Sequence, residues 1–220
     1  MQKTLAFDRL VNYIVGVKQE SETKIKLLKV AVEMIWESSY GSVSVEDICE
    51  RAGVKKGSFY YAFKSKSDLA IAAFEYYWDG KRVYLDQIFS VQVPPLQRLE
   101  MFCNRIINDQ LEKYKTFGKL LGCPFCSLGC ELSTQDENIR RKVEELSGRS
   151  IRYLEPAIRE LMENGQIPLG DPKETSQEIY SYVTGVLLRA KIENNPKIVE
   201  SLWKGVSRLL NIRVTESAAA

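Results

Sequence analysis

The chain has 220 residues, and its 31 Lys and Arg against 29 Asp and Glu give a formal net charge of only +2. Any binding of nucleic acid must therefore come from local clustering of basic residues. The absence of histidine excludes Ser-His-Asp triads, HExxH zinc sites and haem ligation by imidazole. This length is enough for one or two domains with full hydrophobic cores.

The cysteines and the N-terminal residues indicate the cellular compartment in which the protein is expected. Five cysteines in a chain with no secretory signal predict free thiols in a reducing compartment. The first apolar residues are interrupted by Asp8, Arg9 and Asn12, so they form neither a signal peptide nor a membrane span. We therefore expect a cytoplasmic protein with no membrane segment.

Helical periodicity runs through most of the sequence. Apolar residues recur at helical spacing and no stretch keeps a period of two, which predicts an all-α fold. Residues 1–22 form an N-terminal extension, interpreted as a short docked helix or, alternatively, a basic arm that reaches DNA. The face of that helix would comprise Ala6, Leu10, Ile14 and Val17. The first clear helix has a buried stripe of Ile25, Leu28, Val32, Ile35 and Trp36.

Two short helices and a third helical start follow. Ser44 is the expected cap of the first, with Asp47 placed to complete the cap. Gly53 ends this helix, because glycine adopts positive φ at little cost. The second runs from Lys55 to Ala62 and is basic and aromatic, and Ser65 caps a longer helix. A helix, a glycine turn and a basic helix are the layout of a helix-turn-helix that reads DNA.

The segment contains Ala52-Gly53-Val54, Lys56-Gly57-Ser58-Phe59-Tyr60, Phe63 and Lys64-Ser65-Lys66. In their joint spacing these residues resemble the DNA-binding domain of the TetR family of bacterial transcriptional regulators. The resemblance implies a DNA-binding domain over residues 23–70 and a ligand-binding and dimerisation domain over residues 71–212. Residues 213–220 have nothing to pack and are expected to be a disordered tail.

The expected contacts with operator DNA follow from residue chemistry. Free N–H groups at the helix start near Ser44 attract a phosphate. The start of the second short helix would enter the major groove, where lysine donates to guanine and serine reaches either kind of base. Tyrosine hydroxyls and one further lysine would contact phosphates. The expected DNA-binding residues are Ser44, Lys55, Lys56, Gly57, Ser58, Tyr60, Tyr61 and Lys66.

Two positions depart from the family pattern. Ala62 stands where the family often has histidine or tyrosine, which removes one possible backbone contact. Lys55 stands where serine or threonine is common, which is expected to shift base preference. Phe59 and Phe63 are expected to hold the second helix on the core.

Four more long helices are expected after the helix-turn-helix and the helix that follows it, and the last two of them are candidates for a dimer interface. They start near Pro94, Glu137, Glu174 and Pro196. The last two have apolar stripes that would form a four-helix interface between two subunits. An intrasubunit pair explains the same stripes. The stripes are Ile179, Val183, Val186, Leu187 and Ala190, and then Ile198, Leu202, Val206 and Leu209, with Gly185 and Gly205 allowing close approach.

Three thiols fall within eight residues, at Cys123, Cys126 and Cys130. If Pro124 begins a helix, Cys126 and Cys130 lie one turn apart and Cys123 lies where the helix dipole stabilises negative charge. Three interpretations stay open: buried core residues, a redox- or electrophile-sensing switch, and a soft-metal site. A fourth metal ligand is not obvious, although Cys103 or Glu131 could serve. A GCP-containing segment also resembles one in a subset of the family.

The function expected from these features is a homodimeric repressor. An unknown small-molecule effector, or thiol modification, would release it from double-stranded operator DNA. No metal, cofactor or enzymatic motif stands out. The alternatives are an activator, and a thiol-based redox or soft-metal-handling protein without sequence-specific DNA binding. Residues expected to line a mostly apolar effector site are Trp78, Phe102, Phe117, Cys123, Phe125, Cys126, Tyr153 and Tyr180.

Overall fold

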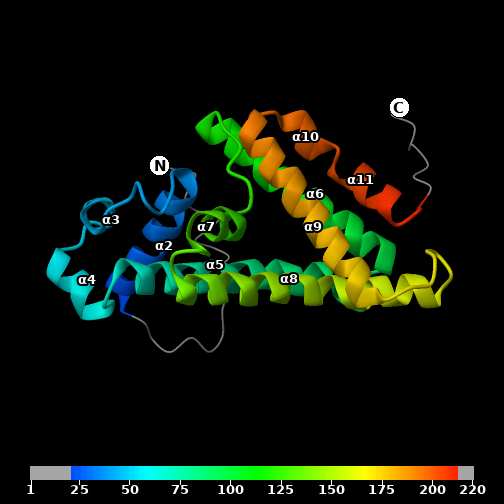
Figure 1. Cartoon of the computed structure of the whole chain (residues 1–220), viewed down its shortest axis with the longest axis horizontal. Helices are drawn as coiled ribbons and strands as arrows, with labels where there is room; N and C mark the ends of the chain where they lie inside the picture. Colours follow the sequence, from blue (N-terminus) through cyan, green and yellow to red (C-terminus); the bar gives the residue numbers. More distant parts are fainter. Residues whose placement is uncertain (1–20, 213–220) are drawn as a thin grey trace. The chain divides into compact units, whose positions relative to one another are not determined.

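The computed structural model describes residues 21–212, and every regular element in that range is a helix, which confirms the predicted all-α class (Figure 1). The expected N-terminal helix or arm and the expected disordered tail lie outside the described residues. In chain order the helices are α2 (Glu22–Glu37), α3 (Val45–Ala52), α4 (Lys56–Ala62), α5 (Lys66–Ile88), α6 (Pro95–Phe117), α7 (Pro124–Leu132), α8 (Glu137–Glu163), α9 (Pro172–Glu193), α10 (Pro196–Glu200) and α11 (Leu202–Leu209).

The chain forms two compact units. Within the described range, the first unit comprises residues 21–84 and 127–146, and the second comprises residues 85–126 and 147–212. Helices α5, α7 and α8 each contribute residues to both units. The border that the sequence places between the DNA-binding domain (residues 23–70) and the second domain (residues 71–212) stays a prediction.

The core of the first unit forms where α2 packs against α3 and α4. The predicted stripe of α2 is buried from Leu28 to Trp36, whereas Ile25 is half-buried. The Ser21 side chain caps the helix by accepting a hydrogen bond from the Lys24 N–H at 3.3 Å. The described apolar side chains with no exposed surface in the first unit are Leu27, Ala31, Ile48, Phe59, Leu69, Ala70, Ala73, Phe74, Ile139 and Leu146.

Local signals define α3 and the turn after it. Ser44 and Asp47 form a reciprocal capping box, in which each side chain accepts a hydrogen bond from the other residue's backbone N–H. At the other end Gly53 adopts φ 64°, and its N–H bonds the carbonyls of Cys49 and Glu50. The predicted cap and glycine turn are therefore confirmed.

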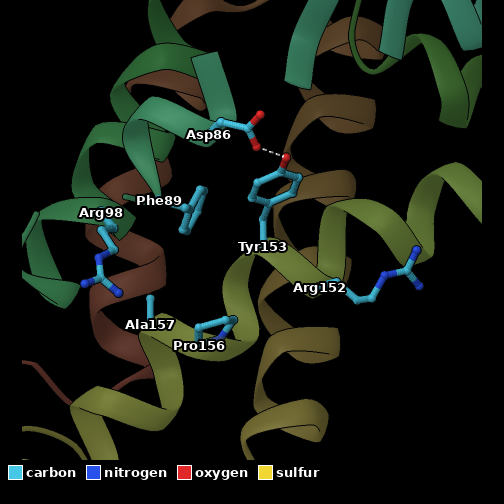
Figure 2. Close-up of a pocket in the computed structure, with 7 residues that line it drawn as sticks. All are labelled: Asp86, Phe89, Arg98, Arg152, Tyr153, Pro156 and Ala157. Carbon is cyan, nitrogen blue, oxygen red and sulfur yellow. Dashed lines mark hydrogen bonds between the residues drawn. The ribbon is translucent and has the colours of Figure 1, made fainter. Parts of the chain in front are cut away.

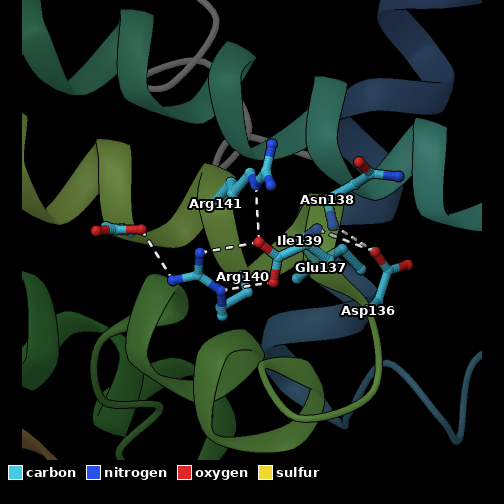
Figure 3. A network of polar contacts seen from close by, with 7 residues as sticks. Asp136, Glu137, Asn138, Ile139, Arg140 and Arg141 are labelled. Carbon is cyan, nitrogen blue, oxygen red and sulfur yellow. Dashed lines mark hydrogen bonds and ion pairs between the residues drawn. The ribbon is translucent and has the colours of Figure 1, made fainter.

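Acidic side chains organise the start of α8 in the first unit (Figure 3). Asp136 accepts hydrogen bonds from the N–H groups of Asn138 and Ile139 at 2.9 and 3.1 Å. Its other carboxylate oxygen accepts one from Ser67 at 2.6 Å. The bond from Ser67, followed by those from the backbone, lowers the pKa of Asp136. The cap thus joins α8 to the start of α5.

Glu137 lies next to this cap and pairs with two arginines on its own helix (Figure 3). Its carboxylate lies 2.7 Å from the Nε atoms of both Arg140 and Arg141. Hydrogen bonds from these two side chains lower the pKa of Glu137 to about 2. The three side chains are partly or largely exposed to solvent, so these pairs add little to stability.

In the second unit, α10 and α11 pack against both α6 and α9. The sequence predicts one helix from Pro196 to Ile212, but the structure divides it into α10 and α11. The break lies at Ser201, whose hydroxyl donates to the Ile198 carbonyl at 2.8 Å and whose N–H bonds the Val199 carbonyl. Hydroxyl side chains compete with the helical bonding pattern in this way, and the apolar periodicity did not reveal it.

Candidate DNA-binding surface, thiol cluster and cavity

Helix α4 is anchored by aromatic rings and leaves its other face in solvent. Phe59 has no exposed surface, and its ring centroid lies 6.0 Å from that of the nearly buried Phe63. Tyr61 is 95% exposed and Tyr60 54% exposed. Lys55, Lys56, Gly57 and Ser58 are also exposed. Six of the predicted DNA-binding residues thus lie together on an accessible surface at the start and outer face of α4.

Lys56 forms an ion pair with Glu46 of α3 on this surface. The hydrogen bond to Glu46 raises the pKa of Lys56, and the same bond lowers the pKa of Glu46. The Lys56 ammonium also lies 6.0 Å from the centroid of the Tyr60 ring. Both partners therefore keep their charge, and Lys56 must leave Glu46 before it can contact a base.

The Ser44 side chain is engaged in the cap of α3. Its hydroxyl accepts from the Asp47 N–H at 3.1 Å and donates to the Asp47 carboxylate at 2.7 Å. The bonds from Ser44 lower the pKa of Asp47. The predicted phosphate contact would therefore use backbone groups at this helix start and not the hydroxyl.

Lys66 and Glu131 hold the loop before α3, and we call these two side chains the loop clamp. The Lys66 ammonium donates to the carbonyls of Tyr40 and Val43 at 2.7 and 2.8 Å. It also lies 4.0 Å from the centroid of the Tyr40 ring. Burial lowers the pKa of Lys66. The Lys66 ammonium already binds this loop, so it would have to leave these carbonyls to contact a phosphate. Its phosphate contact stays a prediction.

Glu131 of α7 completes the loop clamp through its two carboxylate oxygens. One accepts the Tyr40 N–H at 2.8 Å, and the other accepts the Gly41 N–H at 2.6 Å. A Cβ atom at Gly41 would lie 3.1 Å from the same carboxylate, so a side chain there would crowd the contact. Sequence reasoning considered Glu131 only as a metal ligand and missed this role, because no local pattern links residues so far apart.

Two of the clustered thiols lie in the second unit, close to the half-buried phenol of Tyr180. Cys123 directly precedes α7 and Cys126 lies in its first turn; both are half-buried and neither forms a disulfide. The phenol of Tyr180 donates to Ser147 Oγ at 3.1 Å. Burial raises the pKa of Tyr180, and any negative charge on Cys123 or Cys126 raises it further. The phenol therefore stays protonated beside the two thiols.

The segment before Cys123 is held by a buried amide. Gln110 is 4% exposed, and its side chain accepts the Gly122 N–H at 2.9 Å and donates to the Gly122 carbonyl at 3.1 Å. Gly122 has φ 70°, a conformation that side-chain-bearing residues adopt with strain. The backbone directly before Cys123 is therefore held through both the N–H and the carbonyl of Gly122.

The remaining cysteines differ in access to solvent. Cys130 of α7 is exposed, whereas Cys49 and Cys103 are buried. Burial raises the pKa of Cys103 to about 12, so its thiol remains protonated and unreactive near neutral pH. Cys49 of α3 belongs to the core of the first unit.

A cavity of about 320 Å³ lies in the second unit (Figure 2). Among the predicted effector-site residues only Tyr153 lines it, and its hydroxyl donates to the carboxylate of Asp86. Arg98, which is 2% exposed, donates to Glu160 at 2.6 Å and to the Val93 carbonyl at 2.6 Å. The lining is more polar than expected from the sequence and comprises Asp86, Phe89, Arg98, Arg152, Tyr153, Pro156 and Ala157.

The other predicted effector-site residues are distributed differently. Trp78, Phe102 and Phe125 are buried, and Phe117 is 41% exposed. Phe102 lies behind the cavity wall, with its ring centroid 5.7 Å from that of Phe89. Cys123, Cys126 and Tyr180 form the separate thiol site, so the eight residues do not line one pocket.

Comparison with known proteins decides the family. Residues 27–73 match the bacterial regulatory proteins of the tetR family, and residues 95–206 match the tetracyclin repressor-like C-terminal domain. The chain belongs to the TetR family. It is a DNA-binding transcriptional regulator with a helix-turn-helix in α3 and α4, and not an enzyme.

Relatives match this TetR-family chain over most of its length. The transcriptional regulator AcuR of Cereibacter sphaeroides is 28% identical and covers 91% of each chain. The repressor NemR of Escherichia coli is 23% identical, over 87% of this chain and 95% of NemR.

Solved structures of other regulators have the same fold. A TetR regulatory protein from Rhodobacter sphaeroides superposes with a TM-score of 0.76 at 28% identity, over 86% of this chain and 99% of that one. The reduced form of Escherichia coli NemR gives a TM-score of 0.75 at 22% identity, over 90% and 100%.

Within residues 21–212, no group of three or more cysteine, aspartate or glutamate side chains is arranged to hold a metal ion. None of the helices in the same range combines the length and apolarity needed to cross a bilayer.

Proposed function

We propose that this TetR-family regulator is a homodimeric repressor that binds a pseudo-palindromic operator and leaves it on binding a small molecule or on thiol modification. The exposed start of α4 is the observation that best supports sequence-specific binding of the operator. Lys55, Lys56 and Ser58 lie in solvent around a helix whose Phe59 is fully buried. A recognition helix needs this combination of a fixed axis and solvent-exposed polar side chains at its N-terminal end.

The proposed dimer uses the outer faces of α9 and α11. Most of the predicted interface stripes are buried inside the subunit instead, at Ile179, Val183, Leu187, Ala190, Leu202 and Val206. Gly205 meets Tyr182 of the same subunit, since a Cβ there would overlap the tyrosine ring. Apolar side chains that remain exposed are Leu188 (42%), Ile192 (74%) and Leu209 (50%).

Spacing on α9 supports this assignment. Ser181, Gly185, Leu188 and Ile192 are all exposed and recur every three or four residues, so they lie on one face of the helix. No atom lies within 4 Å of a Cβ built on Gly185, which leaves room for a close helix from a second subunit. Two recognition helices then read successive half-sites on one side of the duplex.

Release requires a difference in operator affinity between two states of the dimer. A hundredfold loss of affinity corresponds to a coupling free energy of about 2.7 kcal/mol. The cavity with Asp86, Arg98 and Tyr153 in its wall offers a site for a small molecule with polar groups. The thiols of Cys123 and Cys126 offer a covalent route. Operator binding also places the protein in the cytoplasm.

Fluorescence anisotropy at fixed salt tests the DNA-reading part, with labelled DNA from upstream of the gene. Lys56→Ala should weaken selective binding by about 1–3 kcal/mol. Glu144→Gln, which alters an exposed carboxylate paired with Arg140 on α8, is the control and should bind like the unaltered protein. Equal affinity of Lys56→Ala and the control would remove Lys56 from the recognition surface.

Sedimentation velocity tests the dimer. Leu188→Glu combined with Ile192→Glu should shift the protein towards monomer, because each change places a charge on the proposed apolar contact. Leu169→Glu is the control, since Leu169 is 85% exposed and lies outside α9 and α11. A stable dimer of the double variant would show that another face mediates assembly.

A further inference from the structure

We propose that Cys123 and Cys126 form a dithiol that closes to an intramolecular disulfide when a hydroperoxide oxidises it, and that this disulfide controls operator binding through α7. The control of operator binding rests on the proposed function. The formation of the disulfide does not.

Spacing at the start of α7 singles out this pair among the thiols. The sequence Cys123-Pro124-Phe125-Cys126 places one cysteine directly before the first helical residue and the other in the first turn. A Cys-x-x-Cys pair is the arrangement found in proteins that cycle between dithiol and disulfide. Cys123 lies outside the helical segment, so the regular helix geometry does not hold its Cβ away from that of Cys126.

Cys126 and Cys130 do not have this freedom. Both lie within α7, where side chains four residues apart have Cβ atoms about 5–6 Å apart. A disulfide needs a Cβ–Cβ separation of about 3.5–4.5 Å. A disulfide between Cys126 and Cys130 would therefore distort the helix. A disulfide between Cys123 and Cys126 requires only a change in the backbone that precedes the first turn of α7.

The surroundings keep the two thiols together and open to solvent. Gln110 fixes Gly122 through both of its backbone polar groups, and Pro124 restricts the backbone on the other side of Cys123. Both thiols lie close enough to Tyr180 to influence its ionisation. Each is half-buried and neither is part of a disulfide, so a small oxidant can reach them.

The reaction balances with a hydroperoxide as the oxidant. One thiolate attacks the peroxide, so that a sulfur–oxygen bond forms, the oxygen–oxygen bond breaks and an alcohol or water leaves after taking a proton. The second thiol then attacks the resulting sulfenic acid. The sulfur–sulfur bond forms, the sulfur–oxygen bond breaks, and hydroxide leaves as water with the thiol proton. Two thiols lose two electrons and the peroxide gains them.

Helix α7 connects this chemistry to the DNA-binding segment. The same nine-residue helix carries Glu131, whose carboxylate holds the backbone N–H groups of Tyr40 and Gly41 before α3. A side chain at Gly129 would meet Val143 of α8 at 3.0 Å, so α7 is closely packed there and has little room to absorb a change. A disulfide that alters the first turn of α7 is therefore expected to alter the loop clamp.

Mass spectrometry of the full-length protein tests the bond directly. Reduced protein treated with one equivalent of hydrogen peroxide should lose two hydrogen masses within the tryptic peptide from Leu120 to Arg140. Cys130→Ser should show the same loss. Cys123→Ser and Cys126→Ser should not, because each lacks one partner. Retention of the loss in either of these two variants, or its absence from Cys130→Ser, would overturn the assignment.

Operator binding by the same samples tests the regulation. Oxidation should weaken binding at least tenfold in the unaltered protein and in Cys130→Ser, and dithiothreitol should restore it. Formation of the disulfide with unchanged operator affinity would refute control through α7. If no reduced sample binds any operator selectively, the proposed function fails, and the mass result still decides whether the dithiol exists.

Discussion

Removal of the Glu131 carboxylate should loosen the loop that leads into α3. The two hydrogen bonds to the Tyr40 and Gly41 N–H groups measure 2.8 and 2.6 Å. A bond to a charged group contributes about 1.5–3 kcal/mol, but Gly41 is exposed and Tyr40 only half-buried, so water replaces part of the loss. We therefore expect Glu131→Ala to lower the free energy of local opening by about 2 kcal/mol. Glu131→Gln keeps one acceptor and should lower it by about 1 kcal/mol.

Hydrogen exchange of the peptide that contains Tyr40 and Gly41 measures this opening. Exchange should be about 30-fold faster in Glu131→Ala and about fivefold faster in Glu131→Gln. Operator affinity should fall as well, with an unchanged salt slope, because Glu131 adds no phosphate contact. Glu144→Gln removes a carboxylate charge elsewhere in the first unit and should alter neither quantity. Unchanged exchange at Tyr40 and Gly41 in Glu131→Ala would refute the role assigned to the loop clamp.

Three further predictions concern stability. Hydrogen bonds from Ser44 and Ser67 lower the folded-state pKa values of Asp47 and Asp136. The two carboxylates therefore stabilise the fold above their unfolded pKa of about 4, and this stabilisation is lost as the pH falls through the folded pKa values. Asp47→Asn should flatten the fall of the melting temperature from pH 5 to 3, and an unaltered pH profile would contradict this. Gly205→Ala should destabilise by about 1 kcal/mol, because its Cβ would overlap the end of the Tyr182 side chain, which has to move aside; the same change should cost less in a Tyr182→Ala background, as measured by urea denaturation, and an equal cost in both backgrounds would contradict this. Arg98→Met should destabilise by about 3 kcal/mol, because it leaves Glu160 and two loop carbonyls without their buried partner; a change below 1 kcal/mol in the same assay would show that water replaces the guanidinium.

The sequence predicted best those features whose causes are local. The capping box joins Ser44 to Asp47, three residues away, and the positive φ of Gly53 closes the turn by bonding carbonyls of the preceding helical turn. Both signals act within one turn of the backbone that they stabilise. The start and end of α3 and the exposed start of α4 could therefore be located without a structure.

Features that depend on distant contacts could not be predicted. Periodicity shows that Ile179, Val183 and Leu187 share a buried face, but it does not say whether that face meets the same subunit or another. The structure buries them inside the subunit. The contact between Glu131 and Gly41 joins residues 90 positions apart, and no short pattern indicates it. The cavity likewise combines Asp86 with Tyr153, which lie 67 positions apart.

The ion pair between Lys56 and Glu46 has a consequence for how the regulator searches a chromosome. On the proposed recognition surface, the Glu46 carboxylate occupies the place beside Lys56 that a phosphate would take, so an encounter with unrelated DNA would first have to separate the pair. Non-specific binding depends almost entirely on such lysine–phosphate contacts, whereas at the operator the base contacts add further free energy. If Lys56 contacts DNA as proposed, the pair would therefore shorten the time spent on the vast excess of competing sequence and leave more molecules free to reach the operator.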